Sequence, residues 1–453
     1  MQKRSLLLIT ANFPPVSTSG VHRMIRIVRY LHEMDVNITV LTADETTLTK
    51  RFKYDEELLQ KIPEDVLVVR VPAFQGLKRI LAFKEKLSSS NSRKSKIVPT
   101  NNSAKGGGKS KQGSSKSILR RLLDNVTLNL HSPDNYAFWI VPAIRTGQKL
   151  IREHGIRNIL SSSPPGSAHV VAYYLKRQTG VNWIADFRDP WARKEWHNPE
   201  MTAFKRRINV LYEHRTLQTA DKVVMNTQEM LDIYLQTEPA LASRARVIPN
   251  GYDPADYESL PEPASRNGAP FLLLHTGTLY RGRSPVPFLE AWGKALSDGD
   301  ISLTDMRVQF IGSVSHFAED IEQLSRRYGL QGSLDLIPSM PHRRCLMEMA
   351  HADALLLLQP GTRIQIPAKI YEYIAIRKPI FAISPPGVIS RMVETYNLGW
   401  WADADDVDQI RTALIRMVRF FRSGREHWPV DPAVLDAFDG RRLVQQIGEL
   451  LRE

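Results

Sequence analysis

The stretch that decides the fold is Ile366-Pro-Ala-Lys-Ile-Tyr-Glu-Tyr-Ile-Ala-Ile-Arg-Lys-Pro-Ile-Phe-Ala-Ile383. It predicts a loop, an amphipathic helix and a short buried strand, because Pro367 suits a first helical turn and Pro379 stops the helix before four apolar residues. Lys369 and Glu372 are three apart and share one helical face. A helix start beside a lysine suits a diphosphate, and the carboxylate suits ribose or sugar hydroxyls. A surface ion pair on an ordinary helix explains the same two residues.

Outward from this stretch, apolar strands and amphipathic helices alternate along the whole chain. Strands are expected at residues 6–10, 37–42, 66–71, 158–161, 183–187, 222–226 and 246–248, and again at 271–275, 307–311, 334–337, 354–358 and 380–383. Helices are expected at residues 21–34, 143–153, 168–178, 202–219, 228–235, 407–421 and 440–452. This order predicts an α/β protein with two doubly wound parallel sheets. The expected domains are residues 1–250 and 251–430, with a linker near 252–270.

The composition is that of a globular protein with an apolar core. The chain has 453 residues, of which 42% are hydrophobic, and no apolar run approaches the ~18 residues that cross a bilayer. The apolar start at residues 6–10 runs directly into Asn12-Phe-Pro-Pro15, which favours a buried strand over a signal peptide. A single cysteine, Cys345, excludes an internal disulfide and suits the cytoplasm.

Nearly all of the net charge of +13 lies in one segment. Between Lys78 and Arg121 there are thirteen Lys or Arg residues and one acid, Glu85, a net charge of +12. Residues 88–117 are rich in Ser, Asn, Gly and Lys, which predicts a disordered insertion. The apolar and basic stretch at 77–87 suits an interfacial helix on an anionic membrane, which would place the protein on the inner face of the plasma membrane. A plain linker is the alternative, and nucleic acid is not expected because no aromatic residues are interleaved for stacking.

Polar residues follow the expected strands of the first half. Gly20 precedes a helix and allows the backbone to approach a ligand, although any tight turn has the same need. No G-x-G-x-x-G pattern is present, so the nicotinamide fingerprint is absent. Arg188 and Asp189 end the strand at 183–187 as a functional pair or as a structural ion pair, and His169 begins a helix as an acceptor contact or as a core histidine.

In the second half, a glycine turn and two arginines follow a strand in His275-Thr-Gly-Thr-Leu-Tyr-Arg-Gly-Arg283. Arginine presents a planar fork to diphosphate oxygens. With Lys369, these guanidinium groups would neutralise a departing nucleotide without a metal. The acidic run at residues 403–406 precedes a helix, which favours helix capping over metal binding.

Several segments together resemble one family. They are Phe13-Pro-Pro with Gly20, Ala185-Asp-Phe-Arg-Asp-Pro-Trp191, Val247-Ile-Pro-Asn-Gly-Tyr-Asp253, His275-Thr-Gly-Thr-Leu-Tyr280 and Pro367-Ala-Lys-Ile-Tyr-Glu-Tyr373. In this order they resemble the GT-B glycosyltransferases, specifically the retaining, family-4-like enzymes of bacterial surface polysaccharide biosynthesis. The resemblance covers nearly the whole chain apart from the basic insertion.

The resemblance implies two Rossmann-like domains, a nucleotide-sugar held mainly by the second, and a final segment, residues 431–453, that returns to the first. It implies transfer with retention to a glycan or lipid-linked acceptor, with no metal and no cofactor. Glu372 looks like the ribose-binding glutamate, and Arg283 falls where the family has a diphosphate-binding lysine. The expected catalytic residues are Asp189 and Arg188. The expected donor-side residues are Gly20, Gly277, Thr278, Arg281, Arg283, Pro338, Ile366, Pro367, Lys369 and Glu372, and the acceptor-side residues are Phe13, Pro14, Pro165 and His169.

Three positions depart from the family pattern. Ile364 stands where the family has a first glutamate, Thr278 stands where it has an arginine, and Arg188 stands where it often has a histidine. Two other functions therefore stay open beside the transferase. They are a nucleotide-sugar epimerase of GT-B fold and a non-catalytic GT-B subunit.

Overall fold

The computed structural model describes residues 4–48, 52–74, 129–192, 201–258, 260, 270–280, 282–359, 361–425 and 428–451. The chain divides into two compact units. The first comprises Met1–Met225, Glu238–Arg246 and Leu450–Glu453, and the second comprises Asn226–Thr237 and Val247–Glu449. The expected interfacial helix at 77–87, the expected insertion at 88–117 and Arg281 lie outside the described residues.

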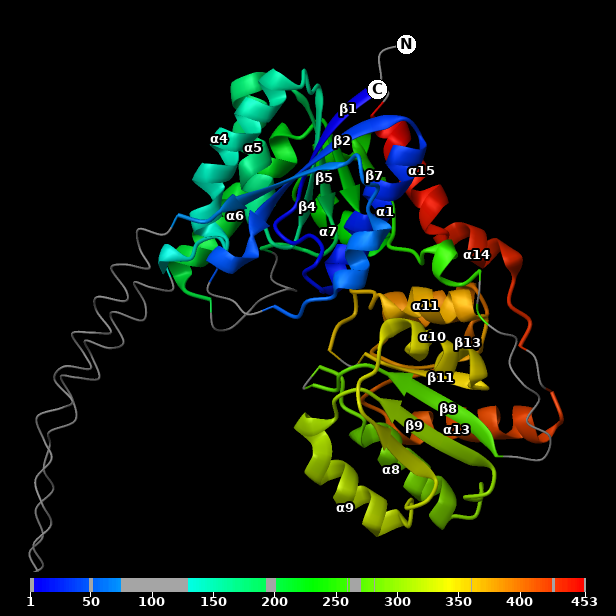
Figure 1. The fold of residues 1–453 in the computed structure, drawn as a ribbon. Coiled ribbons are helices and arrows are strands. Elements are labelled where there is room, and N and C mark those ends of the chain that lie inside the picture. The colour runs from blue at the N-terminus through cyan, green and yellow to red at the C-terminus, as the bar shows by residue number, and fades with distance from the viewer. Residues whose placement is uncertain are drawn as a thin grey trace, which may run out of the picture. The chain divides into compact units, whose positions relative to one another are not determined.

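The first unit is built on a seven-stranded sheet with the order β3-β2-β1-β4-β5-β6-β7, drawn in Figure 1. Each pairing described for it is parallel. The strand order reverses between β1 and β4, and open α/β sheets bind ligands beside the carboxyl ends of strands at such a point. The strands are β1 (Arg4–Ile9), β2 (Val36–Asp44), β3 (Leu67–Pro72), β4 (Asn158–Ser163), β5 (Asn182–Phe187), β6 (Lys222–Met225) and β7 (Ala245–Val247).

The second unit is built on a six-stranded parallel sheet with the order β10-β9-β8-β11-β12-β13. Its order reverses between β8 and β11, so the two sheets share one topology around their switch points. The strands are β8 (Phe271–Thr276), β9 (Met306–Ile311), β10 (Leu334–Ile337), β11 (Ala354–Leu358), β12 (Ile380–Ile383) and β13 (Gly399–Ala402). The expected α/β class and the two parallel sheets are confirmed.

Helices connect the parallel strands in both units. Those between residues 19 and 235 are α1 (Ser19–Glu33), α4 (Ala137–Glu153), α5 (Ser167–Thr179), α6 (Ala203–Thr219) and α7 (Gln228–Leu235). Those that follow β8 are α8 (Val286–Ser297), α9 (Ala318–Tyr328), α10 (His342–His351), α11 (Lys369–Ile376), α12 (Val388–Thr395), α13 (Val407–Arg422), α14 (Pro432–Phe438) and α15 (Gly440–Leu450). None of the helices in the described residues is long and apolar enough to span a bilayer.

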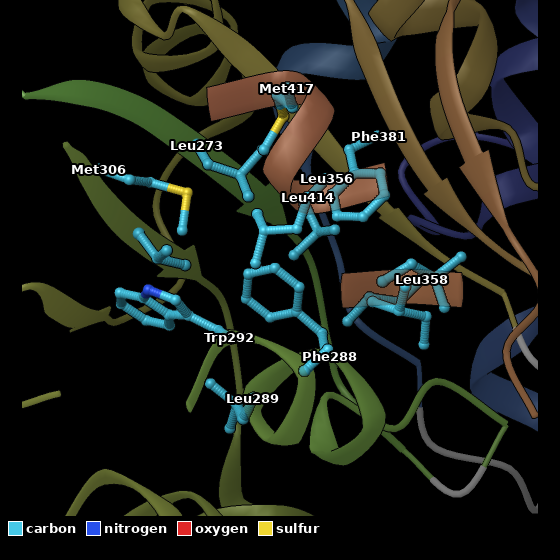
Figure 2. Close-up of a cluster of buried hydrophobic side chains, with 14 of the residues drawn as sticks. Leu273, Phe288, Leu289, Trp292, Met306, Leu356, Leu358, Phe381, Leu414 and Met417 are labelled. Carbon is cyan, nitrogen blue, oxygen red and sulfur yellow. The ribbon is translucent and has the colours of Figure 1, made fainter. Parts of the chain in front are cut away.

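The core of the second unit shows why its strands are apolar throughout. Successive side chains of a strand point to opposite faces, and both faces are covered by helices. Leu273 of β8 packs with Phe288 and Trp292 of α8 and with Met417 of α13 on one face (Figure 2). The neighbouring Leu272 packs on the other face, in a cluster with residues of α10, α11 and α12. Full burial of such a side chain contributes about 1.5–3 kcal/mol.

The deciding stretch at residues 366–383 forms a loop, a helix and a strand in the expected order. The strand β12 has the predicted bounds, but the placement of Pro367 in the first helical turn is wrong. Ala368 is the N-cap of α11, so that Lys369 is its first residue. Two turn-type bonds, from Ile370 N to Pro367 O and from Tyr371 N to Ala368 O, precede regular helix. The helix ends at Ile376, because the next residue takes a left-handed conformation.

Candidate functional site

Two glycines meet at the carboxyl edge of the second sheet. Gly277 follows β8 and donates its N–H to Ile311 O at 2.6 Å. Gly312 follows β9 with a φ of 138°, and a Cβ built on it would lie 2.3 Å from the carbonyl oxygen of Gly277. Only glycine fits this close backbone approach. The turn after β8 therefore lies directly against the turn after β9.

Lys369 reaches this edge from the start of α11. Its Nζ lies 3.5 Å from Thr276 Oγ1. A Cβ on Gly277 would lie 1.8 Å from the same Nζ, and Gly277 has a φ of 115°. The missing side chain of Gly277 thus provides the space that the ammonium group occupies. Both residues were expected at the donor site, and the structure brings them together.

The electrostatic state of Lys369 differs from that of a surface lysine. Burial lowers the pKa of its ammonium group to about 8; the negative charge of Glu372 opposes this shift, whereas Arg283 adds to it. The cation is therefore partly desolvated and close to a second cation. Such a position favours the arrival of an anion, because an anion stabilises the charged form of the lysine.

Arg283 is held by two contacts within the second unit. Its Nε donates to Gln359 Oε1 at 3.2 Å, and its guanidinium carbon lies 5.2 Å from the ring centre of Tyr280. Gln359 is buried and directly follows β11. Gln359 was not expected at the site, although its place directly after an expected strand was a usable signal. The two contacts fix the plane of a guanidinium group near Lys369.

Glu372 lies one turn into α11 and is bound from another helix. Its Oε1 lies 3.2 Å from Nε2 of His342, the first residue of α10, and its side chain is 30% exposed. This carboxylate is therefore both oriented and accessible to a ligand. His342 was not expected at the site, and nothing in the sequence pairs it with Glu372.

The remaining donor-side residues of the second unit lie around the same edge. Pro338 follows β10 and is exposed, as is Thr278, whereas Ile366 and Pro367 are buried before α11. Ile364 is half-buried in the loop between β11 and α11. Cys345 lies on α10, and burial raises the pKa of its thiol to about 11, so it is a neutral thiol at pH 7.

His275 is a core residue beneath this edge. It is 1% exposed, and its Nδ1 lies 2.9 Å from Leu356 O. Because a carbonyl only accepts, this nitrogen carries the proton. Burial, followed by the nearby charge of Lys369, lowers the pKa of the imidazole to about 3. His275 is therefore neutral at physiological pH.

In the first unit, Arg188 lies over Gly20. A Cβ on Gly20 would lie 1.9 Å from Arg188 Nη1. The Nε of Arg188 donates to Ser163 O at 3.1 Å, and its Nη2 donates to Pro164 O. Burial lowers the pKa of this guanidinium, an effect that the carboxylate of Asp186 opposes. Arg188 thus connects the end of β5 to the β4–α5 turn and to the start of α1.

A buried ion pair and a serine also connect α1, β5 and β4. Arg23 of α1 donates from Nε and Nη2 to the two carboxylate oxygens of Asp186, at 3.2 and 2.8 Å. Ser162 Oγ donates to Asp186 Oδ2 at 2.7 Å. Arg23 and Asp186 are 5% and 1% exposed. Asp186 was not expected as a site residue, because it occupies an interior position of a strand that is mostly apolar.

The acceptor-side residues lie in the interior or close to it. His169 is fully buried, its Nδ1 is 2.7 Å from Ser161 Oγ, and burial lowers the pKa of its imidazole to about 3. Phe13 and Pro14 are buried, and Pro165 is half-buried. The contacts described for His169 are those of a core histidine.

Asp189 follows Arg188 after β5 and is half-buried. The loop around it is fixed on both sides. Trp191 packs on Gly166, where a Cβ would lie 2.1 Å from the indole, and Ala192 N donates to Glu213 Oε2 at 2.7 Å. These contacts hold the loop that carries Asp189 in place.

The acidic run at residues 403–406 caps a helix, as predicted. Asp406 is the N-cap of α13 and accepts from Gln409 N at 2.9 Å. Asp403 accepts from Asp405 N. Within the ranges that the structure describes, no cluster of three or more His, Cys, Asp or Glu residues is arranged to hold a metal ion.

Comparison with known proteins agrees with this architecture. Residues 105–256 match the model of Glycosyltransferase Family 4. A glycosyltransferase from Rickettsia africae ESF-5 has a similar structure, with a TM-score of 0.62 at 12% identity over 100% of this chain and 98% of that one. Anabaena Alr3699/HepE in complex with UDP and glucose has a TM-score of 0.61 at 13% identity over 99% of both chains. WaaG, a glycosyltransferase involved in lipopolysaccharide biosynthesis, has a TM-score of 0.57 at 13% identity over 99% of both chains. No curated protein sequence matches.

The two parallel sheets and the structural neighbours define the fold of this protein as GT-B. More particularly, the match at residues 105–256 identifies a Glycosyltransferase Family 4 domain. The predicted resemblance is confirmed at this level.

Proposed function

We propose that the protein transfers a sugar, with retention, from a nucleotide-sugar to a glycan or lipid-linked acceptor in polysaccharide biosynthesis, without a metal ion. The observation that carries the proposal is the pair of cations at the edge of the second sheet. Lys369 lies over Gly277, and Arg283 is close enough to lower the pKa of that lysine. Two fixed cations beside a glycine turn suit a diphosphate, which carries the charge that develops on the leaving group.

In the proposed reaction the bond between the anomeric carbon and the diphosphate oxygen breaks, and a bond from that carbon to the acceptor oxygen forms on the same face. The acceptor proton passes to an oxygen of the departing diphosphate. Lys369 and Arg283 bind the diphosphate, and Glu372 binds the ribose hydroxyls. In the first unit we assign Asp189 to the acceptor hydroxyl. The contacts of Arg188 with Ser163 O and Pro164 O favour a positioning role for it.

Two structural neighbours support the donor and the pathway. Anabaena HepE has been crystallised with UDP-glucose, and WaaG is involved in lipopolysaccharide biosynthesis. The backbone at Pro338 and at neighbouring residues is where we expect the base to bind.

Nucleotide binding is the first test. Calorimetric titration with UDP, GDP and ADP should identify one nucleoside diphosphate that binds. Arg283→Ala and Glu372→Ala should each weaken its binding about tenfold or more, because loss of a hydrogen bond to a charged group costs about 1.5–3 kcal/mol. Arg326→Ala, which removes an exposed arginine of α9, is the matched control and should have no effect. Unchanged affinity in both site variants would contradict the assignment of the donor site.

Turnover with a panel of nucleotide-sugars separates the candidate activities. Release of free nucleotide only when an acceptor is present supports the transferase, and activity that persists with a chelator supports metal independence. Formation of an isomeric nucleotide-sugar would identify an epimerase. Absence of any product would favour a non-catalytic subunit, which the apolar Ile364 makes worth testing. Asp189→Asn should lower kcat with little change in nucleotide affinity if Asp189 orients the acceptor.

A further inference from the structure

The carboxylate of Glu372 is held by a histidine of another helix. Nε2 of His342 lies 3.2 Å from Oε1 of Glu372. The negative charge of Glu372 acts on both Lys369 and Cys345, and an ionised carboxylate only accepts hydrogen bonds. Nε2 of His342 therefore carries a hydrogen and is the donor of this bond. A neutral histidine of this tautomer and a protonated histidine can both make it.

The bond lies where two helices of the second unit pack together. α10 and α11 are in contact, and Figure 1 shows them side by side. Cys345 follows His342 by three residues, so the two lie on the same face of α10. Cys345 packs against the apolar cluster that includes Ile370 and Ile374 of α11. The face of α10 that begins with His342 is therefore the face turned toward α11.

The contact leaves the carboxylate accessible. The side chain of Glu372 is 30% exposed, and that of His342 is 40% exposed. A carboxylate has two oxygens, and each can accept more than one hydrogen bond. Glu372 can therefore hold the histidine and still accept from the hydroxyl groups of a ligand. The bond from His342 restricts the rotation of the carboxylate without covering it.

His342 also directly follows the segment where we expect the base to bind. Gly312 N donates to Ile337 O at 2.9 Å, which fixes the start of this segment at the end of β10. Pro341 is the N-cap of α10, so His342 is the first residue of the helix. The base and the ribose of a nucleotide are joined covalently, so the groups that bind them must be correctly placed relative to each other. The bond between His342 and Glu372 connects these two parts of the site.

We propose that His342 is a positioning residue that orients the carboxylate of Glu372 toward the ribose and thereby determines the preference of the protein for ribonucleotides. It acts through Glu372 and does not touch the reacting atoms. The inference rests on the proposed function, in which Glu372 binds the ribose hydroxyls. It deepens that function by assigning the selectivity for ribose to two residues on different helices.

The test compares ribonucleotides with deoxyribonucleotides. Whichever of UDP, GDP and ADP binds is titrated into the full chain by calorimetry, together with its 2′-deoxy and 2′,3′-dideoxy analogues. We expect wild type to prefer the ribonucleotide to the dideoxy analogue about tenfold or more, because the analogue leaves the charged Glu372 without hydroxyl donors. His342→Phe keeps a ring but cannot donate. It should weaken ribonucleotide binding about threefold or more and leave the affinity for the dideoxy analogue unchanged.

Three further proteins sharpen the comparison. His342→Gln restores an N–H donor and should recover most of the preference for the ribonucleotide. His351→Phe makes the same exchange at the last residue of α10, where the histidine is bonded to Met347 O, and should behave as wild type. In a Glu372→Ala background, His342→Phe should have no further effect on nucleotide affinity, because the carboxylate that it positions is missing.

Equal weakening of the ribonucleotide and the dideoxy analogue by His342→Phe would overturn the proposal, because a merely structural role predicts that result. An unchanged affinity for the ribonucleotide in this variant would overturn it too. Should His342→Phe lower the melting temperature, His342→Ala is judged by the same comparison. Wild type that binds both ligands equally would refute the ribose assignment of Glu372 along with this inference, and would leave the two cations of the donor site standing. Absence of binding by all three nucleotides would overturn the donor site itself, and the role of His342 with it.

Discussion

At Gly277 a methyl group would occupy the position of the Lys369 ammonium, 1.8 Å from the ideal Cβ. At Gly20 a methyl group would similarly displace Arg188, at 1.9 Å. Gly20 was expected to let the backbone approach a ligand, and Gly277 was expected in a glycine turn at the donor site. The structure shows that each makes room for a cation of its own unit, and this contact decides where the positive charge lies.

Nucleotide affinity should depend on pH through Lys369. Its pKa is about 8 in the ligand-free protein, and a bound diphosphate raises it, so the complex holds more protons than the free protein above pH 8. Affinity should therefore fall between pH 7.5 and 9, by up to about tenfold, since one pKa unit corresponds to about 1.4 kcal/mol. Calorimetry over this range measures the slope. Lys369→Arg keeps its charge throughout, so its profile should be flat, and an equal slope in this variant would exclude Lys369 as the titrating group.

The effects of substitutions at Gly20 and Arg188 on stability should be non-additive in a double-mutant cycle. Gly20→Ala forces the guanidinium away from Ser163 O and Pro164 O, and we expect a loss of about 1–3 kcal/mol in the free energy of unfolding. In an Arg188→Ala background the same methyl group meets no guanidinium, so Gly20→Ala should cost almost nothing there. Urea unfolding of the four proteins measures the coupling. Additive effects would show that Gly20 is required for another reason.

At the scale of elements, the ends of helices follow local chemistry. α13 begins at Asp406, whose side chain accepts from Gln409 N. Asp406→Ala should lower the free energy of unfolding by about 1 kcal/mol, the usual cost of losing an N-cap. Asp408→Ala is the control, because Asp408 lies in the first turn but is not the cap. A urea titration of both variants decides, and an equal or larger loss at Asp408 would contradict the assignment of the cap.

The sequence predicts the elements more completely than the contacts between them. Apolar runs bounded by turn residues gave the strands β10, β11 and β12 with their observed bounds, because such strands are buried on both faces. The start of α11 was misplaced by two residues, since Pro367 is compatible with the turn before a helix as well as with its first turn. The pairing of His342 with Glu372 and the contact of Arg188 with Gly20 could not be predicted. Each joins residues far apart in the chain, and register and loop path decide which of them meet.

At the scale of the whole molecule, one histidine is fully buried among the described residues of each unit. His169 lies in the first unit and His275 in the second, and burial lowers the pKa of each to about 3. The unfolded chain has ordinary histidines, so between pH 6.5 and 3 it binds more protons than the folded protein. Stability should therefore fall as pH falls through this range.

The expected loss is up to about 1.4 kcal/mol per pH unit for each histidine, on top of the loss from other groups. Urea unfolding at pH 7 and at pH 5 measures it. Phenylalanine has a similar shape and no titrating proton, so His169→Phe should lower stability at pH 7 while reducing its dependence on pH. The same dependence in the variant and in wild type would show that His169 is protonated in the folded protein.

The depressed pKa of Lys369 means that the empty protein holds a cation in a place that disfavours it. Folding alone does not relieve this conflict; a bound anion does. The protein without a bound anion is consequently less stable than it would be if this lysine were fully hydrated. Its lysine is already in place to bind an anion. If Lys369 binds the donor as proposed, part of the affinity for the donor arises when the chain folds, because this lysine is held partly dehydrated over Gly277.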